Sequence, residues 1–277
     1  MFDIWGSVRN CTFSGIWTLW EGKGLGHILS VVSGKGGTGK TSFCAGVAVA
    51  LCALGEKVLL IDADRGLRSL DIVLGMSDRV LFSWGDVLDG VCSLKEAAVK
   101  HPVVKNLRVL TAPGMEESGS RYSGDQIRAL LERARPHFTW ILIDCPAGFG
   151  SEVVDFALGA DQAVVVSTPD HTSLRGAQRI GTQLANGGAE QIKIAVNRVR
   201  AGMIDRGDSV NIDAAMDAAG LPLLGVIPED QDVIACGNLG QVLVLFSDGY
   251  ARVAYANIAR RLRGTRVPLL GGVKLKK

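Results

Sequence analysis

The sequence lacks the cysteine pairs that hold zinc or iron–sulfur clusters. Its six cysteines include no C-x-x-C pair and have no histidine at metal-ligand spacing. They are Cys11, Cys44, Cys52, Cys92, Cys145 and Cys236. Isolated cysteines of this kind are typical of buried free thiols in a reducing compartment. Cys44 and Cys52 lie eight residues apart in an apolar segment, which predicts that both pack near one face of a helix.

An excess of one charge sign and a long apolar run are also missing. Lys and Arg total 30 against 28 Asp and Glu, so the net charge is +2. The field of the whole molecule therefore makes nucleic acid an unlikely main partner, and any basic surface must be local. No run of 18 uncharged apolar residues occurs, so we expect no transmembrane helix. At 277 residues and 47% hydrophobic content, one large α/β domain is favoured over two small ones.

A glycine-rich stretch between two apolar segments is the strongest signal in the chain. Residues 34–41 read G-K-G-G-T-G-K-T, after the apolar run 28–33 and before the Ala- and Leu-rich segment 42–54. This order predicts a strand, a phosphate-binding loop (P-loop) and a helix. The glycines, which let successive backbone N–H groups face a phosphate, are Gly34, Gly36, Gly37 and Gly39.

The residues at the end of this loop carry its expected chemistry. Lys40 can place an ammonium on the β- and γ-phosphates, and the Thr41 hydroxyl can bind Mg²⁺ held between them. The helix beginning near Lys40 adds its positive dipole end. With Thr38 and Ser42 completing the phosphate-contacting set, the expected cofactors are ATP and Mg²⁺.

Acidic residues end two of the other apolar runs. The run 57–62 ends in Asp62 and is followed by Asp64, while the run 139–144 ends in Asp144, a Walker B pattern. We expect Asp144 to enter the Mg²⁺ shell, Asp62 to orient Mg²⁺-bound water, and Asp64 to position or activate the attacking water. The alternative for Asp62 or Asp64 is a helix N-cap.

The rest of the chain alternates strand and helix signals, which predicts a doubly wound, mainly parallel sheet in a three-layer α/β/α P-loop NTPase. Residues 86–92 are amphipathic without a chemical signal, and the polar residues 115–123 predict a mobile loop. The further expected strands cover residues 107–112, 162–168, 191–197 and 223–227. The further expected helices cover residues 125–135, ended by Pro136, and residues 172–184, 212–219 and 248–262.

The second lysine of the loop, Lys35, makes it resemble the deviant Walker A motif K-G-G-x-G-K-T of the MinD/ParA family. Three further stretches resemble the MinD branch of that family: residues 62–75, which contain D-A-D-R-G-L-R-S-L-D, residues 144–148, D-C-P-A-G, and residues 226–230, V-I-P-E-D. Asn197-Arg198 resembles the family's adenine-reading pair. This sequence departs from the family motifs at three positions. Thr38 stands where valine is common, Ser69 stands where the family has asparagine, and Arg65 occupies a commonly apolar position.

This resemblance implies a Mg²⁺-dependent ATPase that forms a homodimer in the ATP state. Lys35 would act across the dimer interface, and Gly148 would sense the γ-phosphate. Asn197, Arg198 and Pro228 would surround the adenine; the alternative for Pro228 is a surface turn.

The implied role is placement of the division septum by cycling between cytoplasm and the inner face of the cell membrane. The implied partners are a MinC-like inhibitor and a MinE- or DivIVA-linked regulator.

Other functions fit the residues less well. A ParA-type or flagellar-number ATPase, acting in DNA partitioning or polar positioning, is the nearest alternative. The sequence does not indicate the extended basic face that binding to DNA would need. An iron–sulfur carrier would need paired cysteines. A P-loop ligase would need a pocket for a small-molecule carboxylate, and the sequence shows no sign of one. A nucleotide-sensing scaffold that does not hydrolyse ATP could have lost Asp62, Asp64 and Asp144, but all three are present.

Both ends of the chain differ from its centre, so we expect an ATPase domain over residues 27–262 with distinct flanks. Residues 1–26 contain three of the five tryptophans and no signal-peptide pattern. They could be a docking strand, a disordered tail or translated upstream sequence; we favour the last, with Leu25 read from the start codon.

The C-terminal end is basic. Residues 260–277 contain seven basic residues and no acid, which suits an anionic membrane. Pro268 and the pair Gly271-Gly272 interrupt any amphipathic helix, however. The tail 263–277 could therefore be a truncated membrane-targeting segment or a solvated basic end.

Overall fold

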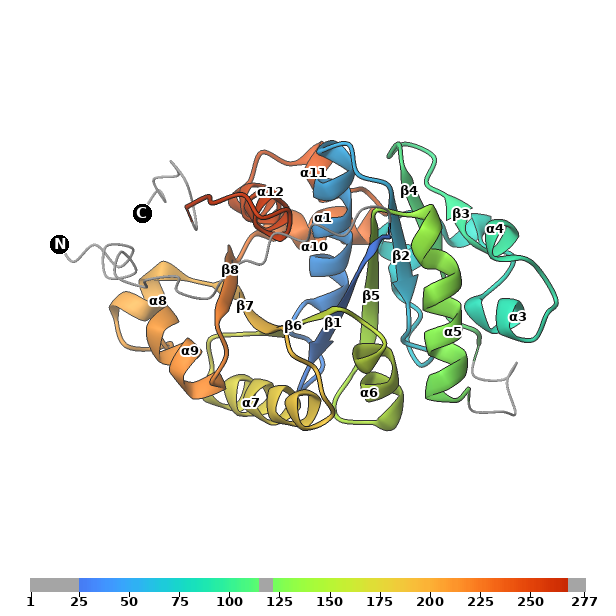
Figure 1. Ribbon diagram of the computed structural model, residues 1–277. Coiled ribbons are helices and arrows are strands. Elements are labelled where there is room, and N and C mark those ends of the chain that lie inside the picture. Colours follow the sequence, from blue (N-terminus) through green and yellow to red (C-terminus); the bar gives the residue numbers. More distant parts are fainter. Residues whose placement is uncertain (1–24, 115–121, 269–277) are drawn as a thin grey trace.

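An eight-stranded sheet forms the centre of the molecule, whose computed structural model describes residues 25–114 and 122–268 (Figure 1). The strand order is β3-β4-β2-β5-β1-β6-β7-β8. Only the β3–β4 pair is antiparallel; every other neighbouring pair is parallel. The strands are β1 (His27–Ser33), β2 (Val58–Asp62), β3 (Val99–Lys100), β4 (Leu107–Leu110), β5 (Trp140–Ala147), β6 (Gln162–Ser167), β7 (Ile192–Val199) and β8 (Leu223–Pro228).

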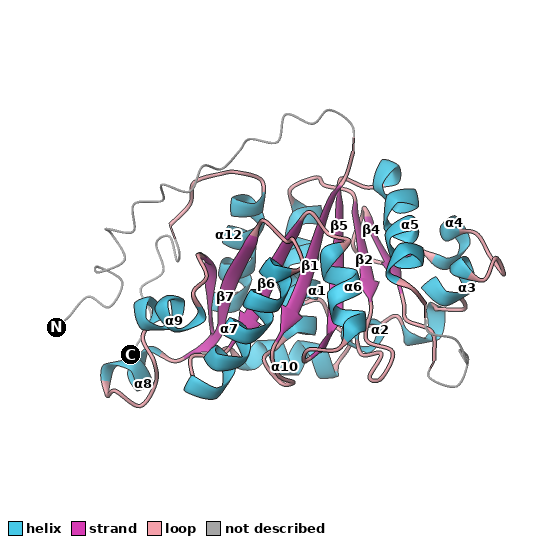
Figure 2. Ribbon diagram, turned by 60° about the horizontal axis from the view of Figure 1, so that its bottom comes forward, coloured by secondary structure: helices cyan, strands magenta, loops and turns pink. Residues whose placement is uncertain are grey.

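Helices cover both faces of this sheet, so the predicted three-layer, doubly wound architecture is confirmed (Figure 2). The longer helices are α1 (Lys40–Ala53), α5 (Gly124–Ala134), α6 (Ser151–Leu158), α7 (His171–Asn186), α9 (Ile212–Ala219), α10 (Gln231–Asn238) and α12 (Tyr250–Leu262). The short ones are α2 (Leu70–Val73), η2 (Ser77–Arg79), α3 (Trp84–Leu88), α4 (Leu94–Ala97), η3 (Arg135–His137), α8 (Ala201–Asp205) and α11 (Leu243–Phe246).

Alternation along the central strands creates two separate cores. In β1, Ile28 and Val32 join the core under α5, α6, α7 and α9, whereas Leu29 and Val31 join the core under α1 and α12. Successive side chains of a strand point to opposite faces, so an almost wholly apolar strand fills both layers. This explains why the central strands read as unbroken apolar runs. Cys44 and Cys52 lie buried in the second core, and the five described cysteines are free thiols.

One strand is longer than the sequence predicts. Strand β5 continues to Ala147 instead of ending at Asp144, because Ala147 still pairs with Ser33. Helix α5 ends at Ala134, next to its expected end before Pro136, and the 3₁₀ turn η3, whose first residues tolerate proline, follows it. The amphipathic stretch near residue 86 contains α3, which begins at a capping box between Ser83 and Asp86.

The basic C-terminal run is partly used inside the fold. Arg261 is buried and donates to the carbonyl oxygens of Leu224 and Val267. Arg263 pairs with Glu56 at 2.8 Å. Arg261 and the first cation of the expected tail, Arg263, are therefore held by contacts within the fold.

The described residues contain no helix with the length and apolarity needed to cross a bilayer. The expectations for residues 1–24, for most of the loop 115–123 and for residues 269–277 lie outside the described residues.

Candidate nucleotide site

The glycine-rich loop connects the carboxyl end of β1 to α1, at the centre of the sheet. Gly39 is the N-cap of α1 with φ +89°, a left-handed conformation that side chains with a Cβ rarely adopt. Cβ atoms added at Gly36 or Gly37 would meet nothing within 4 Å, so this side of the loop faces open space. Its backbone can therefore approach a ligand.

The opposite side of the loop is packed tightly against the protein. A Cβ on Gly34 would lie 2.4 Å from the backbone of Gly176 in α7, and one on Gly39 would lie 2.3 Å from Asn197 Nδ2. Asn197 is buried in β7 and donates its amide to the Thr38 carbonyl oxygen at 2.8 Å. The residue that the resemblance places beside adenine thus also supports the phosphate loop.

Lys40 and Thr41 occupy the first turn of α1, where the sequence places them. Lys40 is only 9% exposed. The Thr41 hydroxyl lies 3.4 Å from the hydroxyl of Ser69. Both Thr41 and Lys40 are close enough to Asp144 to oppose the rise that burial causes in the pKa of that carboxyl. The loop, Asp144 of β5 and residue 69 therefore meet at one point.

Asp62, the last residue of β2, and Asp144, within β5, are direct neighbours that pair in the parallel register. Burial, followed by the nearby charge of Asp144, raises the pKa of Asp62 to about 7. Burial also raises the pKa of Asp144 to about 6, although Thr41 and Lys40 oppose the shift. Two buried carboxylates side by side disfavour each other's charge, and a bound cation would relieve that cost.

Asp62, at the end of β2, and Asp64 both accept hydrogen bonds from backbone N–H groups. Asp62 accepts from the amides of Asp64 and Leu70, and Asp64 accepts from those of Gly66 and Leu67 at 3.0 and 3.1 Å. Neither acid is a helix N-cap, because Asp62 ends β2 and the N-cap of α2 is Ser69. Asp64 remains only partly buried, with a second carboxylate oxygen to offer.

Lys35 lies on the exposed side of the loop and reaches across to the start of α7. Its ammonium lies 3.2 Å from Asp170 Oδ1 and 3.2 Å from the Thr172 hydroxyl. The side chains of Lys35 and Asp170 are 43% and 47% exposed. Such an exposed ion pair contributes little to stability and can be exchanged for another anion.

The other residues predicted for the site lie in or next to β5, β7, β8 and α1. The Gly148 amide donates to the Ser33 carbonyl oxygen at 2.9 Å. Arg198 adopts φ +58° and pairs with Glu229 at 3.0 Å. Pro228 ends β8 in register with Val199 and is buried. Ser42 follows Thr41 in α1 and is half-buried.

These residues fit a magnesium nucleotide. Asp144 Oδ1 is buried and accepts no hydrogen bond from the described residues, so it has capacity for a cation or its bound water. Within the described ranges, no group of three or more His, Cys, Asp or Glu side chains is placed to hold a metal. Mg²⁺ in phosphate sites is bound through one or two carboxylates, water and the phosphates themselves. A threonine hydroxyl beside one strand-end carboxylate supplies that donor set.

Sequence reasoning missed three residues of this site, Asp170, Thr172 and Gly176, and named Ser69 only as a departure from the family motif. Asp170 follows β6 as Asp64 follows β2, so the rule of acids at strand ends could have identified it. No local signal distinguishes Gly176.

Fold and site together define a P-loop nucleotide-binding protein. Residues 29–244 match the CobQ/CobB/MinD/ParA nucleotide binding domain. The septum site-determining protein MinD of Bacillus subtilis is 35% identical over 246 residues, 88% of this chain and 92% of that protein. MinD of Thermotoga maritima is 37% identical over 88% of this chain and 91% of that protein. The chain belongs to the MinD family, as its motifs predicted.

Solved structures agree with this assignment. The MinC:MinD cell division protein complex of Aquifex aeolicus contains a chain similar to this one with a TM-score of 0.82 and 32% identity, covering 88% of this chain and 98% of that one. The septum site-determining protein MinD of Pyrococcus horikoshii, complexed with Mg-ADP, has a TM-score of 0.76 and 30% identity, covering 85% and 95%.

Proposed function

We propose that this protein is a Mg²⁺-dependent ATPase that dimerises when it binds ATP and separates after hydrolysis. The observation that carries the proposal is the position of Lys35: it stands at the open side of the phosphate loop, half-exposed, and is held by an exposed ion pair with Asp170 and a hydrogen bond to the Thr172 hydroxyl. A cation placed there can leave Asp170 and reach the phosphates of a nucleotide on a second subunit.

Within one subunit, the remaining residues divide the work of phosphoryl transfer. Lys40 and the loop amides hold the phosphates, and Thr41 and Asp144 would hold Mg²⁺, which neutralises phosphate charge when bound. Asp64 orients a water whose oxygen attacks the γ-phosphorus. The bond from that phosphorus to the β–γ bridging oxygen breaks, ADP retains the electron pair, and the proton that the water loses passes to the released phosphate.

We further propose that this cycle positions the division septum at the cytoplasmic face of the cell membrane. The support is the family itself, together with the relative in Aquifex aeolicus that was solved as a MinC:MinD complex. A MinC-like inhibitor and a MinE- or DivIVA-linked regulator are the proposed partners. The cations after Arg263 would contribute to contact with anionic lipid.

Replacing Lys35 with glutamine should leave ATP binding by the monomer within about threefold of wild type, because Lys40 and the loop remain. It should abolish the ATP-dependent dimer. Light scattering behind size-exclusion chromatography, with ATP and with ADP, measures both species. Asp170→Asn is the matched control: asparagine still accepts from the Ser173 amide, the ion pair is lost, and dimers should persist. Dimers of Lys35→Gln as abundant as wild type would contradict the trans role.

Co-sedimentation with anionic liposomes tests the membrane proposal, using chains that end at Leu262 and at Lys277. Only the longer chain should pellet, and more with ATP than with ADP, because a dimer presents two basic tails. Since truncation at Leu262 removes the Arg263–Glu56 pair, both chains are first compared by thermal denaturation. Failure of both chains to pellet would refute direct lipid contact and move the partner to DNA, a protein landmark or a separate adaptor.

A further inference from the structure

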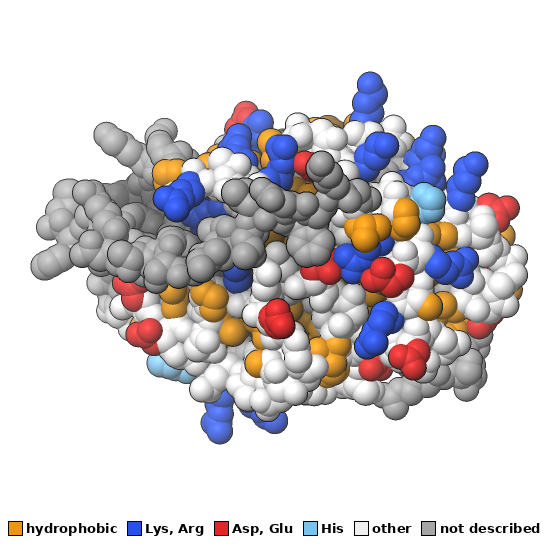
Figure 3. All heavy atoms as spheres, in the orientation of Figure 1, with side chains coloured by type: hydrophobic (Ala, Val, Ile, Leu, Met, Phe, Trp, Pro, Cys, Tyr) orange, Lys and Arg blue, Asp and Glu red, His pale blue; other side chains and the backbone are white. Residues whose placement is uncertain are grey.

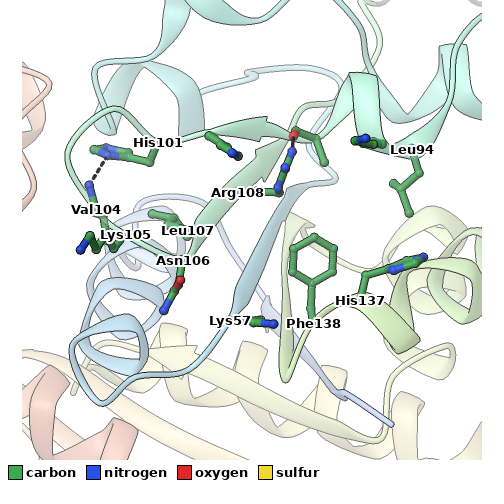
Figure 4. Close-up of a pocket in the computed structure, with 13 residues that line it drawn as sticks. Lys57, Leu94, His101, Val104, Lys105, Asn106, Leu107, Arg108, His137 and Phe138 are labelled. Atoms are coloured by element: carbon green, nitrogen blue, oxygen red, sulfur yellow. Dashed lines mark hydrogen bonds between the residues drawn. The ribbon is translucent and has the colours of Figure 1, made fainter. Parts of the chain in front are cut away.

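A second concave site lies at the end of the sheet opposite the nucleotide loop. Its cavity of about 590 Å³ is lined by residues that precede β2 and β5, by α4, and by the β3–β4 hairpin (Figure 4). The phosphate loop follows the carboxyl end of β1, whereas Lys57 and Phe138 stand before the amino ends of β2 and β5. The cavity volume is within the range of small-molecule sites.

The rim of this cavity is positively charged. It contains four lysines and one arginine, and no aspartate or glutamate among the described residues: Lys57, Lys95, Lys100, Lys105 and Arg108. The two nearest acids in the chain are used elsewhere, since Glu56 pairs with Arg263 and Glu96 accepts from Ser93 in a capping box. Figure 3 shows lysine and arginine side chains gathered at the upper right, where Figure 1 places β3, β4 and α4.

Two of these cations are forced together by the backbone. Lys100 and Arg108 are directly opposite each other in the antiparallel β3–β4 pair, so their side chains share one face. Like charges directly opposite each other destabilise a strand pair. The Ala98 carbonyl oxygen accepts one hydrogen bond from Arg108, at 2.5 Å, and among the described residues no other hydrogen bond of this guanidinium is found. An anion bound between Lys100 and Arg108 would attract both cations and so offset the repulsion between them.

The floor of the cavity is apolar. Val104 and Leu107 are buried there, and Leu94 and Phe138 are partly buried against the core. In Figure 4 the side chains of Arg108, Leu94, Phe138 and His137 surround a common space. A ligand that satisfies both rim and floor therefore combines an anionic group with an apolar or aromatic body.

His101 does not contribute a charge. Its Nδ1 accepts from the amides of Val103 and Val104, so the proton is on Nε2, which donates to the Leu74 carbonyl oxygen. Burial lowers the pKa of this imidazole. His101 shapes the hairpin, and the anion must be bound by the lysines and the arginine.

We propose that this basic cavity binds a phosphate monoester carried on an apolar or aromatic body. The facing pair Lys100 and Arg108, with further lysines on the rim, suits a dianion better than a single carboxylate, and arginine presents paired N–H groups to phosphate oxygens. The proposal is independent of the ATPase function. Its ligand could be a soluble metabolite or a lipid headgroup, which share the phosphate monoester.

Calorimetric titration of 1-naphthyl phosphate into the full chain, kept in saturating Mg²⁺ and ADP so that the phosphate loop is filled, tests the proposal. We expect one site per chain. Lys100→Gln should weaken this binding about tenfold, the factor of one charge-assisted hydrogen bond, while raising the melting temperature of the unliganded protein by removing the repulsion with Arg108. Lys57→Gln, on another segment, should also weaken binding. Arg128→Gln is the matched control, because it removes an exposed cation of α5 outside the cavity.

Absence of a site, or equal affinity in wild type and Lys100→Gln, would overturn the proposal. Inorganic phosphate that binds as tightly as 1-naphthyl phosphate would overturn the role of the apolar floor. Soluble dihexanoyl phosphatidic acid distinguishes the two sources: tighter binding than 1-naphthyl phosphate supports a lipid headgroup, and weaker binding supports a soluble ligand.

Discussion

Replacing Lys40 with alanine is expected to reduce ATP affinity by about 100-fold or more. A buried hydrogen bond to a charged group contributes up to about 3 kcal/mol, and tenfold in affinity corresponds to about 1.4 kcal/mol. Lys40 lies at the start of α1 and its side chain is 9% exposed. We expect that Lys35, the other cation of the loop, cannot take its place, because Lys35 lies on the exposed side of the loop. Calorimetric titration with ATP and Mg²⁺ measures the effect.

Lys35→Gln is the matched control for this experiment, because it removes a lysine from the same loop at an exposed position. The affinity of the Lys35→Gln monomer for ATP should remain close to that of wild type. Thermal denaturation checks that Lys40→Ala remains folded. If the folded Lys40→Ala protein kept its affinity for ATP, the assignment of residues 34–41 as the phosphate loop would be refuted.

Replacing Asp64 with alanine is expected to lower the ATP hydrolysis rate by about 10²- to 10⁴-fold, the usual contribution of a group that positions or activates the attacking nucleophile. ATP binding should be retained, since Lys40 and Thr41 are untouched. The ATP-bound dimer should therefore live longer than in wild type. Phosphate release and dimer lifetime after an ADP chase measure the two effects.

The hydrogen bonds of Asp64 require a second variant. Its Oδ1 accepts from the amides of Gly66 and Leu67, so alanine also disturbs the turn. Asparagine keeps one such acceptor but carries no negative charge. Asp64→Asn should hydrolyse ATP as slowly as Asp64→Ala; recovery of wild-type hydrolysis would restrict Asp64 to a turn-forming role. Dimers of Asp64→Ala as short-lived as wild type would also refute the water-positioning role.

The sequence alone predicted the fold well because the relevant signals are local. A mainly apolar run filling both layers identifies a central parallel strand, as in residues 28–33. The spacing of glycines, Lys40 and Thr41 sets a strand–loop–helix turn within eight residues. Strand-end acids share an edge of any parallel sheet, so Asp62 and Asp144 could be placed together before their register was known.

Local patterns were less reliable at element ends and in the C-terminal run. Strand β5 was expected to end at Asp144, yet it continues to Ala147, which pairs with Ser33 of the neighbouring strand. Arg261 was counted in the basic run that suits an anionic membrane, but it is buried against the carbonyl oxygens of Leu224 and Val267. Amphipathic pattern cannot reveal such a partner, because the carbonyl oxygens come from other segments.

Residue identity and spacing established the family, the phosphate loop and the acids, since each depends on neighbours within a few positions. The packed sheet decided which distant groups meet them. Asn197 holds a loop 159 residues away, Lys35 pairs with Asp170 across 135 residues, and the basic cavity gathers cations from separate segments. Register, crossover and burial set those distances, and they arise only when both cores close around the strands.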